Sequence, residues 1–294
     1  MDKHGLIIIN SFSYSDIFKN QTKRLSEEFL KLGVKIDVRR NCNVDVYLGN
    51  YEIINKIKDH DFVVYLDKDK YAARMIEKSN QFIFNNPKAI ELCDDKLQTY
   101  IALSQNNIKM PITIASPLRF YKTDVDDGSF LKKVTEILSF PIVVKGAFGS
   151  LGNRVFLAHN FEELQLLREK LIDVPHLYQE FIAESAGTDT RVIVIGNKVC
   201  AAMIRKSETD FRSNIELGGK GYPVTLSESY IEMAQNVSKI LGLDYCGIDI
   251  LTDKQGNPVL CEVNSNAFFN MIEKVSGVNV AGTYAKHIYD KVYN

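Results

Sequence analysis

The chain has 294 residues, of which 45% are hydrophobic and 25% are charged, so it is long enough for a large core and for two or three subdomains. Its formal net charge of −1 gives no global basic field, which argues against nucleic acid or an anionic membrane as a partner. The apolar run at the N-terminus is too short for a signal peptide or a membrane span, and the five cysteines form no C-x-x-C pair; we therefore expect a cytoplasmic protein with reduced thiols.

Apolar strands and helical segments alternate in the first third of the chain. Strands are expected at 5–10, 34–38, 61–67 and 81–84, with helices over 16–32, 51–58 and 70–78. This alternation predicts a parallel sheet covered by helices on both faces, a Rossmann-like unit. No G-x-G-x-x-G follows the first strand, so we expect no dinucleotide there.

The middle of the chain contains a glycine-spaced loop between two strands. A polar-faced helix is expected over 87–107, and "PIVVKG" and "RVFLA" then flank the loop. Lys145 stands before Gly146, Gly149 and Gly152, whereas a Walker A loop places its lysine after the glycines and leads into a helix. We interpret the loop as a flap whose backbone N–H groups hold phosphate. Considered alone, a glycine-containing hairpin with a snorkelling lysine is the more common structure.

The last third is rich in hairpins. If the turn of "CGIDILTDKQGNPVLCEVNSN" centres on Gln255-Gly256, Asp249 lies opposite Glu262 and Gly247 opposite Asn264. Facing carboxylates on apolar strands repel unless a cation compensates, and an Asp, Glu and Asn set suits Mg²⁺, with Gly247 leaving room for the ligand. A solvent-facing side of the hairpin and a register slipped by one residue remain open alternatives.

Several cations accompany these carboxylates. Lys96 lies in "DDK", Arg191 in "GTDTR", Arg205 at a strand end and Arg212 in "FRSN". Each one alone is typical of a solvated surface. Together with the two facing carboxylates, they predict a polyphosphate–magnesium pocket.

The order of motifs resembles one enzyme superfamily. "DDK", "VVKGAFGSLG", "QEFI", "GTDTRV", "DFRSN", "GIDIL" and "CEVNSN" follow one another as in the RimK-like branch of the ATP-grasp carboxylate–amine ligases, from about residue 85 to the C-terminus. The resemblance implies an α/β (α+β) fold. It has an N-terminal Rossmann-like pre-ATP-grasp domain over 1–86, a central ATP-grasp subdomain with the flap over 87–185, and a C-terminal subdomain with the metal site over 186–294.

The resemblance also assigns roles to residues. It implies phosphate contacts for the two lysines and the flap, adenine contacts for the "QEFI" backbone, a nucleotide contact for the aspartate of "GTDTR", and phosphate-side contacts for "RSN". The implied nucleotide-binding residues are Lys96, Lys145, Gly149, Ser150, Gly152, Glu180, Phe181, Asp189, Arg212, Ser213 and Asn214. The implied catalytic residues are Arg212, Arg205 and Lys145, and the implied magnesium ligands are Asp249, Glu262 and Asn264.

Such ligases phosphorylate a carboxylate with ATP and then let an amine displace phosphate. The resemblance therefore implies ATP and two Mg²⁺ ions, with Mn²⁺ as a substitute, a small-molecule or peptide carboxylate, an amino acid, and a dimer or tetramer. A phosphotransferase and a catalytically silent nucleotide-binding regulator stay open as alternatives. After "EVNS" the chain lacks the usual Pro-Gly type turn, and Asn266, Phe268 and Phe269 alter a wall near the acceptor site. Whether the two phenylalanines face substrate or pack in the core stays open at this point. This departure leaves the acceptor unidentified.

Overall fold

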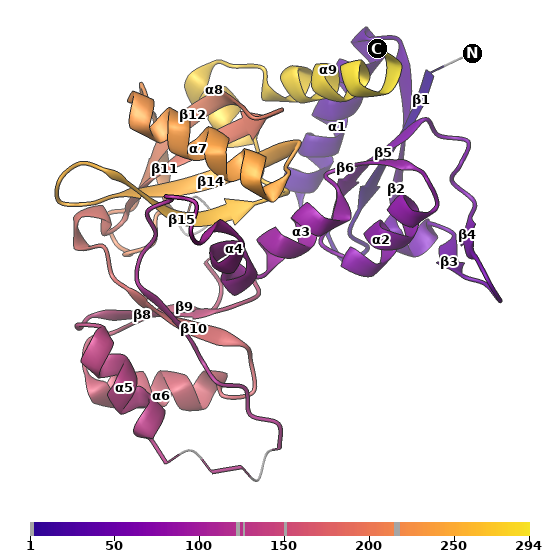
Figure 1. Ribbon diagram of the computed structural model, residues 1–294. Coiled ribbons are helices and arrows are strands. Elements are labelled where there is room, and N and C mark those ends of the chain that lie inside the picture. Colours follow the sequence, from indigo (N-terminus) through magenta and orange to yellow (C-terminus); the bar gives the residue numbers. More distant parts are fainter. Residues whose placement is uncertain (1–2, 122–123, 126, 150–151, 215–217) are drawn as a thin grey trace.

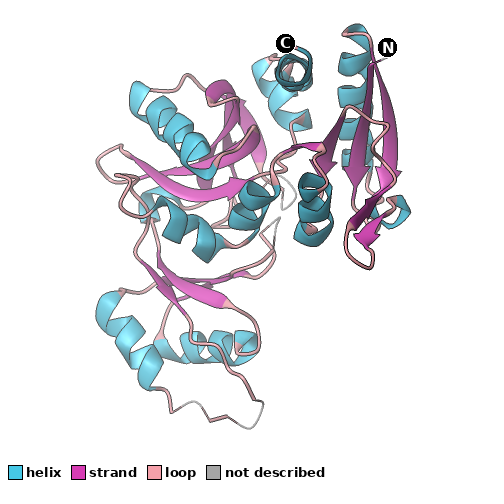
Figure 2. Cartoon of the chain, turned by 45° about the vertical axis from the view of Figure 1, so that its right-hand side comes forward, coloured by secondary structure: helices cyan, strands magenta, loops and turns pink. Residues whose placement is uncertain are grey.

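The computed structural model describes residues 3–121, 124–125, 127–149, 152–214 and 218–294. This part contains two four-stranded sheets, one five-stranded sheet and a two-stranded hairpin. Figures 1 and 2 show the C-terminal sheet lying between the N-terminal sheet on one side and the central sheet on the other. Among the described helices, none has the length and apolar composition needed to cross a membrane.

The N-terminal sheet is parallel, as the alternation of strands and helices predicts. Its order is β2-β1-β5-β6, formed by β1 (Lys3–Ile9), β2 (Val34–Arg40), β5 (Phe62–Leu66) and β6 (Phe82–Phe84). Its helices are α1 (Asp16–Lys31) and α2 (Lys70–Lys78). All five residues of β5 are buried, which is expected for a strand covered on both faces.

The helix expected over 51–58 is wrong. This region forms the hairpin β3 (Val46–Leu48) and β4 (Ile53–Asn55), preceded by a short 3₁₀ helix, η1 (Asn41–Asn43). The β-branched pair Ile53-Ile54 favours extended backbone, and Ile57 is fully buried beside this hairpin rather than on a helix face.

The helix expected over 87–107 is two helices. α3 (Pro87–Asp94) ends where Asp95 adopts an extended conformation, and the Asp95 carboxylate then accepts from the N–H groups of Leu97 and Gln98 to cap α4 (Lys96–Leu103). The break makes Lys96 the first residue of α4. Its own N–H donates to the carbonyl of Ala147 at 3.0 Å, at the start of the glycine loop.

The central sheet carries the flap. Its order is β7-β10-β8-β9, formed by β7 (Thr113–Ala115), β8 (Ile142–Gly146), β9 (Val155–Ala158) and β10 (His176–Glu180), and it is packed against α5 (Ser129–Ile137) and α6 (Phe161–Leu171). The two strands predicted on either side of the glycine loop are confirmed as the antiparallel pair β8 and β9.

The C-terminal sheet is antiparallel, with the order β13-β12-β11-β14-β15. Its strands are β11 (Thr188–Ile195), β12 (Lys198–Lys206), β13 (Lys220–Pro223), β14 (Tyr245–Thr252) and β15 (Pro258–Asn264), with η2 (Ala183–Ser185) before them. One apolar core joins it to α7 (Glu228–Leu241), and another to α8 (Asn270–Ser276), α9 (Val280–Tyr293) and α1.

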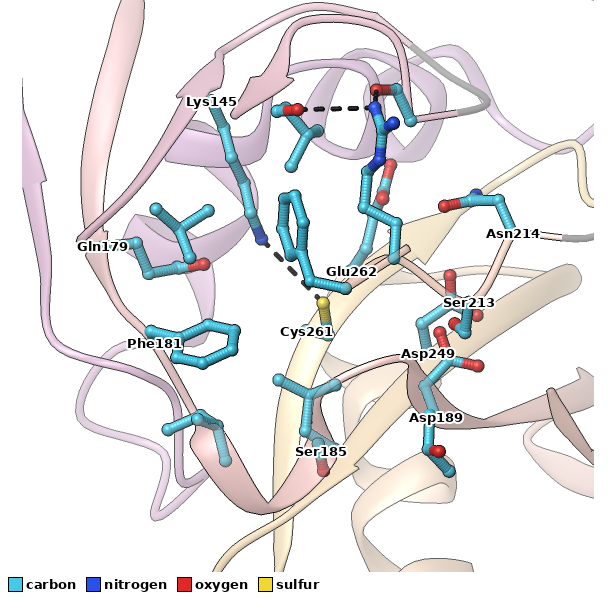
Figure 3. Close-up of a pocket in the computed structure, with 18 of the residues that line it drawn as sticks. Lys145, Gln179, Phe181, Ser185, Asp189, Ser213, Asn214, Asp249, Cys261 and Glu262 are labelled. Atoms are coloured by element: carbon cyan, nitrogen blue, oxygen red, sulfur yellow. Dashed lines mark hydrogen bonds between the residues drawn. The ribbon is translucent and has the colours of Figure 1, made fainter. Parts of the chain in front are cut away.

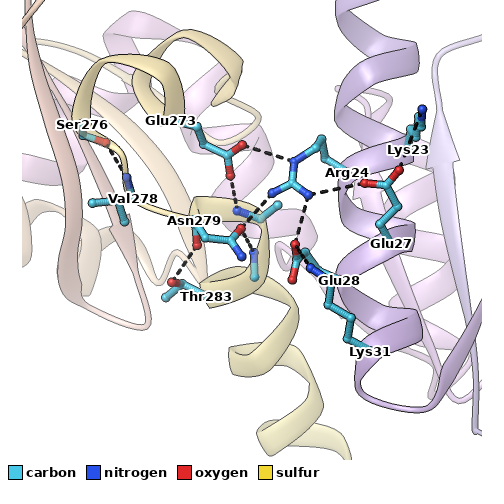
Figure 4. A network of polar contacts seen from close by, with 12 residues as sticks. Lys23, Arg24, Glu27, Glu28, Lys31, Glu273, Ser276, Val278, Asn279 and Thr283 are labelled. Atoms are coloured by element: carbon cyan, nitrogen blue, oxygen red, sulfur yellow. Dashed lines mark hydrogen bonds and ion pairs between the residues drawn. The ribbon is translucent and has the colours of Figure 1, made fainter.

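The N-terminal and C-terminal sheets share a core and a polar junction. Phe29 and Phe62 belong to the same buried cluster as Tyr245 and Tyr284, so the two sheets are packed as one unit. At its edge, Arg24 of α1 donates to Asn279 at 2.9 Å and pairs with Glu273 of α8 at 3.4 Å (Figure 4).

Candidate active site

A pocket lies between the central and C-terminal sheets (Figure 3). Most residues singled out by the motifs line it, and they come from both sheets and from the segment after β12. These are Lys145, Gly152, Glu180, Phe181, Asp189, Arg205, Arg212, Ser213, Asn214, Asp249 and Glu262. Lys96, Gly149 and Asn264 are not among the lining residues, and Ser150 lies outside the described residues.

The hairpin that carries the expected metal ligands has the predicted pairing for an unexpected reason. Asp249 faces Glu262 and Gly247 faces Asn264, but Thr252 faces Pro258, so the turn centres on Gln255. Continued without interruption, that register would set Asp249 opposite Cys261. A bulge between Asp249 and Ile250 inserts Cys261 as an extra residue, which restores the facing carboxylates. It also lets the consecutive side chains of Cys261 and Glu262 both line the pocket.

Charged side chains form a row across neighbouring strands of the C-terminal sheet. Asp189 of β11 lies opposite Arg205 of β12, and Arg191 of β11 lies opposite Asp249 of β14. Arg205 donates to both oxygens of Asp189, at 2.7 and 2.5 Å, and is 2.8 Å from Asp249. Arg191 binds Asp249 in a bidentate manner, with one bond of 2.8 Å. The row therefore pairs each of these buried charges with an opposite one.

This pairing sets the charge states within the row. Burial raises the pKa of Asp249, but Arg191 and Arg205 outweigh burial and hold that pKa below its ordinary value. Burial likewise lowers the pKa of Arg205, yet Asp249 and Asp189 bring the net shift upward. Asp189, Arg205 and Asp249 are 8%, 3% and 3% exposed, so the row is a fixed buried array rather than a solvated strand face.

Glu262 has a different cation. Lys96 Nζ lies 3.5 Å from Glu262 Oε1 and donates to the carbonyl of Gly149 at 2.9 Å, which links the flap to β15. The side chain of Glu262 keeps 26% of its surface exposed, so its oxygens are accessible from the pocket. The positive charge expected beside the facing carboxylates therefore comes from two places. Arg191 and Arg205 pair with Asp249, and Lys96 lies next to Glu262.

The donor types suit a divalent hard cation, because two carboxylates and one amide on adjacent strands are the oxygen ligands that Mg²⁺ takes. Glu262 is the accessible member, since the 3.5 Å contact from Lys96 leaves lone pairs on it, whereas both oxygens of Asp249 contact arginines and Asn264 does not line the pocket. The interpretation of Gly247 is wrong, however. A Cβ there would lie 2.4 Å from the Cβ of Ala267 and 3.2 Å from Cδ of Arg191, so protein atoms rather than ligand need the space.

Lys145 is a buried cation that faces the pocket. It is 8% exposed, and its Nζ lies 3.9 Å from the sulfur of Cys261 (Figure 3). Within the described part of the chain, no carboxylate forms an ion pair with it. Burial lowers the pKa of Lys145, but Cys261, Tyr100 and Glu262 outweigh burial and raise it, so the ammonium is charged at neutral pH. A charged, dehydrated ammonium without a carboxylate partner suits a bound anion.

The flap is tied to the C-terminal sheet by Arg212. Its guanidinium pairs with Asp210 and donates to the carbonyls of Gly152 at 2.8 Å and Val155 at 3.4 Å. Gly149 and Gly152 have φ angles of +130° and +74°, conformations that favour glycine at both ends of the loop tip. Arg212 therefore holds the flap at Gly152, as Lys96 holds it at Gly149.

The apolar end of the pocket contains the expected "QEFI" segment. Phe181 lies edge-on to Phe211, with ring centroids 6.3 Å apart, and both rings line the pocket. Glu180 fixes the neighbouring chain, because its N–H donates to the carbonyl of Ile112 at 2.9 Å and its carboxylate accepts from the N–H of Ile112. The two aromatic rings form an apolar end of the pocket, and the neighbouring charged residues form an end that suits an anionic ligand.

Sequence reasoning missed three features of this site. Cys261 enters it only through the bulge, and Phe211 was hidden inside the "DFRSN" motif, although an aromatic residue between two charges was a usable signal. Arg191 was noted but given no role. Asp189 and Arg191 two residues apart on an apolar strand indicated charges on one strand face.

The aromatic residues after β15 pack against other parts of the protein, and neither lines the pocket. Phe269 is fully buried in the core shared by the N-terminal and C-terminal sheets, whereas Phe268 packs edge-on against Phe18 of α1, with ring centroids 4.9 Å apart. The side-chain oxygen of Asn266 is buried and has no hydrogen-bond partner among the described residues.

Known proteins are similar to this chain in sequence. The RimK-like ATP-grasp domain matches residues 93–288. Beta-citrylglutamate synthase B of Danio rerio is 37% identical over 233 residues, which cover 76% of this chain and 55% of the synthase, so the chain spans little more than half of that relative. A probable alpha-L-glutamate ligase of Thioalkalivibrio sulfidiphilus is 36% identical over 220 residues, covering 73% of this chain and 69% of the ligase.

Solved structures share the whole architecture. The structure of the ATP-grasp ligase PsnB complexed with minimal precursor, Mg and ADP matches with a TM-score of 0.71 and 16% identity, covering 98% of this chain and 97% of that one. At this identity the likeness shows the fold, and it confirms the expected mixed α/β ATP-grasp architecture.

Proposed function

The chain belongs to the RimK-like ATP-grasp family, and from this premise we propose that it is an ATP- and magnesium-dependent ligase that joins a carboxylate to the amine of an amino acid. The proposal rests on the buried ammonium of Lys145. This group faces a pocket that also contains the carboxylates of Asp249 and Glu262, and its Nζ contacts the sulfur of Cys261. A polyphosphate would supply the missing negative charge at Lys145.

The pocket suits ATP at both ends. We propose that the adenine packs against the apolar surface that Phe181 and Phe211 form together, while the phosphates extend toward Lys145 and the flap. Lys96 and Arg212 hold the flap backbone at Gly149 and Gly152, so a nucleotide enclosed there is shielded from water. Ser213 and Asn214 line the same side as Arg212 and are proposed phosphate donors.

Asp249, Glu262 and Asn264 would hold magnesium, which supplies positive charge to the phosphoryl oxygens during transfer. Of these, Glu262 has the accessible carboxylate, whereas Asp249 is held in place by Arg191 and Arg205. Asp189 in turn orients Arg205, and so we propose that Asp189 positions that guanidinium rather than contacting the nucleotide directly.

The proposed reaction has two steps. The acceptor carboxylate attacks the γ-phosphorus, and the bond to ADP breaks, giving an acyl phosphate. The amine nitrogen then attacks the acyl carbon, phosphate leaves, and the nitrogen loses a proton. Arg205 is fixed by two carboxylates, and we propose that its remaining N–H groups stabilise charge on the transferring phosphoryl.

We propose glutamate as the amine, because the names of both relatives above contain it. The acceptor is a small molecule or a peptide with an exposed carboxylate. We further propose two magnesium ions, replaceable by Mn²⁺, and a dimer or tetramer. Five unpaired cysteines support the cytoplasm as the compartment.

The test is ADP release by the purified chain with ATP, Mg²⁺, a panel of carboxylates and each of the common amino acids, with mass analysis of the products. An amide product that requires both substrates supports the ligase. A phosphorylated acceptor that accumulates with or without amine supports a phosphotransferase instead, and tight Mg·ATP binding without turnover supports a regulatory nucleotide-binding protein.

A further inference from the structure

Two histidines and one aspartate meet on the N-terminal parallel sheet, away from the pocket. His4 lies on β1, Asp37 on β2, and His60 two residues before β5. Leu6 is the neighbour of Asp37 in the register, so Asp37 and His4 share one face of the sheet. Three separate chain segments thus direct nitrogen and oxygen atoms to one point.

The spacing of these atoms is that of ligands around a small cation. Asp37 Oδ2 lies 3.4 Å from His4 Nε2 and 3.2 Å from His60 Nε2, and one ligand atom from each residue lies within 4.8 Å of the others. A tetrahedral zinc ion with ligand bonds of about 2.0–2.1 Å separates neighbouring ligand atoms by about 3.3 Å. The two recorded separations bracket that value.

Backbone contact holds the ring of His60 with Nε2 toward Asp37. His60 Nδ1 lies 3.1 Å from the carbonyl of Ile57, and Nε2 lies 3.2 Å from Asp37 Oδ2. When the proton is on Nδ1, the lone pair of Nε2 points toward the carboxylate, and a cation between the two atoms would bind both. A backbone carbonyl on the non-ligating nitrogen is the usual support for a metal-bound histidine.

His4 gives a second, independent observation. Its Nε2 is buried and has no hydrogen-bond partner among the described residues, although the ring lies 4.5 Å from that of His60. Nearby carboxylate Asp61 is already occupied, because it accepts from the N–H of His4 and from Tyr293. The buried Nε2 of His4 points toward the Asp37 carboxylate at 3.4 Å, and a cation between the two atoms would give this nitrogen a partner.

The surroundings leave room for a fourth ligand. His60 is 5% exposed, while the side chains of His4 and Asp37 are 28% and 35% exposed, which leaves one side open to water. Arg39 approaches Asp37 at 3.7 Å from the exposed side, where solvent screens its charge.

We propose that His4, Asp37 and His60 form a binding site for one divalent transition-metal ion, with zinc as the matching ion and water as the fourth ligand. The site would join β1, β2 and the start of β5, so its effect would be on the stability of the N-terminal sheet. It is separate from the nucleotide pocket and does not depend on the proposed ligase activity.

The test uses the full chain without an affinity tag, stripped with a chelator and titrated with Zn²⁺ alone while ADP and Mg²⁺ saturate the pocket. We expect one site, detected by competition with a chromophoric chelator. Asp37→Asn and His60→Gln should weaken zinc binding at least tenfold. The matched control is His159→Gln, at an exposed histidine, which should bind as the wild type does. Zinc should raise the melting temperature of the wild type and leave that of Asp37→Asn unchanged.

Cobalt supplies a readout that needs no enzyme activity. Co²⁺ in a four-coordinate nitrogen–oxygen site absorbs visible light far more strongly than in a six-coordinate oxygen site, so the wild type should show the strong band and Asp37→Asn should lack it. If Asp37→Asn unfolds, His4→Gln at the start of β1 replaces it. Equal zinc stoichiometry and affinity in wild type and variants, or no zinc binding by the wild type, would overturn the proposal.

Discussion

Replacing Asn85 with alanine removes the polar clamp between β6 and the hairpin that carries Asp249 and Glu262. The Asn85 amide donates to the carbonyls of Tyr245 and Ser265, both at 2.7 Å, and its oxygen accepts from the N–H groups of Asp244 and Tyr245 at 2.7 and 2.9 Å. Asn85 is 2% exposed, so alanine would leave four buried backbone groups unpaired. Each costs about 1 kcal/mol or more, and partial water entry limits the sum, so we expect the free energy of unfolding to fall by about 3–5 kcal/mol.

The measurement is urea unfolding of the full chain, followed by circular dichroism and tyrosine fluorescence. The control is Asn106→Ala, at an exposed position, which should change the unfolding free energy by about 0.5 kcal/mol or less. Asn85→Asp keeps the acceptor but turns a carboxylate oxygen toward two carbonyls, so its loss at neutral pH should equal or exceed that of Asn85→Ala. A loss below about 1 kcal/mol for Asn85→Ala would refute the view that this clamp holds the sheets together.

Two further predictions concern the pocket. Lys145→Met keeps the apolar stem and removes the charge, so the Kd for Mg·ATP measured by calorimetry should rise about 10–100-fold. The control Lys132→Met, on the exposed face of α5, should leave that Kd unchanged. Equal affinities for Lys145→Met and wild type would exclude a phosphate contact. Burial raises the pKa of the Cys261 thiol to about 11, so iodoacetamide at pH 8 should alkylate exposed Cys42 first and Cys261 only at higher pH, as followed by peptide mass spectrometry. Equally fast labelling of both cysteines at pH 8 would contradict the raised pKa of the Cys261 thiol.

Local patterns were sufficient for the parallel sheet and for the existence of the two hairpins. The apolar runs of β1 and β5 are too continuous for an exposed strand, and Gly33 and Gly242 mark helix ends where φ is positive. The segment 51–58 was misassigned because Ile53, Ile54 and Ile57 fit both a helical and an extended pattern. Pairing with β3, which decides between them, is not visible in the segment itself.

Most of the residues that line the pocket could be singled out from the sequence, but not the contacts among them. A turn centred on Gln255-Gly256 predicts that Asp249 and Glu262 face each other, yet the bulge at Cys261 that produces this register has no local sequence signature. Arg191 meets Asp249 only because β11 lies next to β14, a contact between residues 58 positions apart. Non-local strand order therefore decides which cation neutralises which carboxylate, and sequence patterns do not contain that order.

The most direct test of the proposed ligase is the transfer of oxygen from the acceptor to phosphate. The acceptor found in the substrate panel is prepared with ¹⁸O in its carboxylate and incubated with ATP, Mg²⁺ and glutamate, and the released phosphate is analysed by mass spectrometry. An acyl-phosphate route predicts one ¹⁸O atom in phosphate for each amide formed, and Glu262→Gln should abolish both products while ATP still binds. Amide formed together with unlabelled phosphate, or full turnover by Glu262→Gln, would contradict the proposed mechanism.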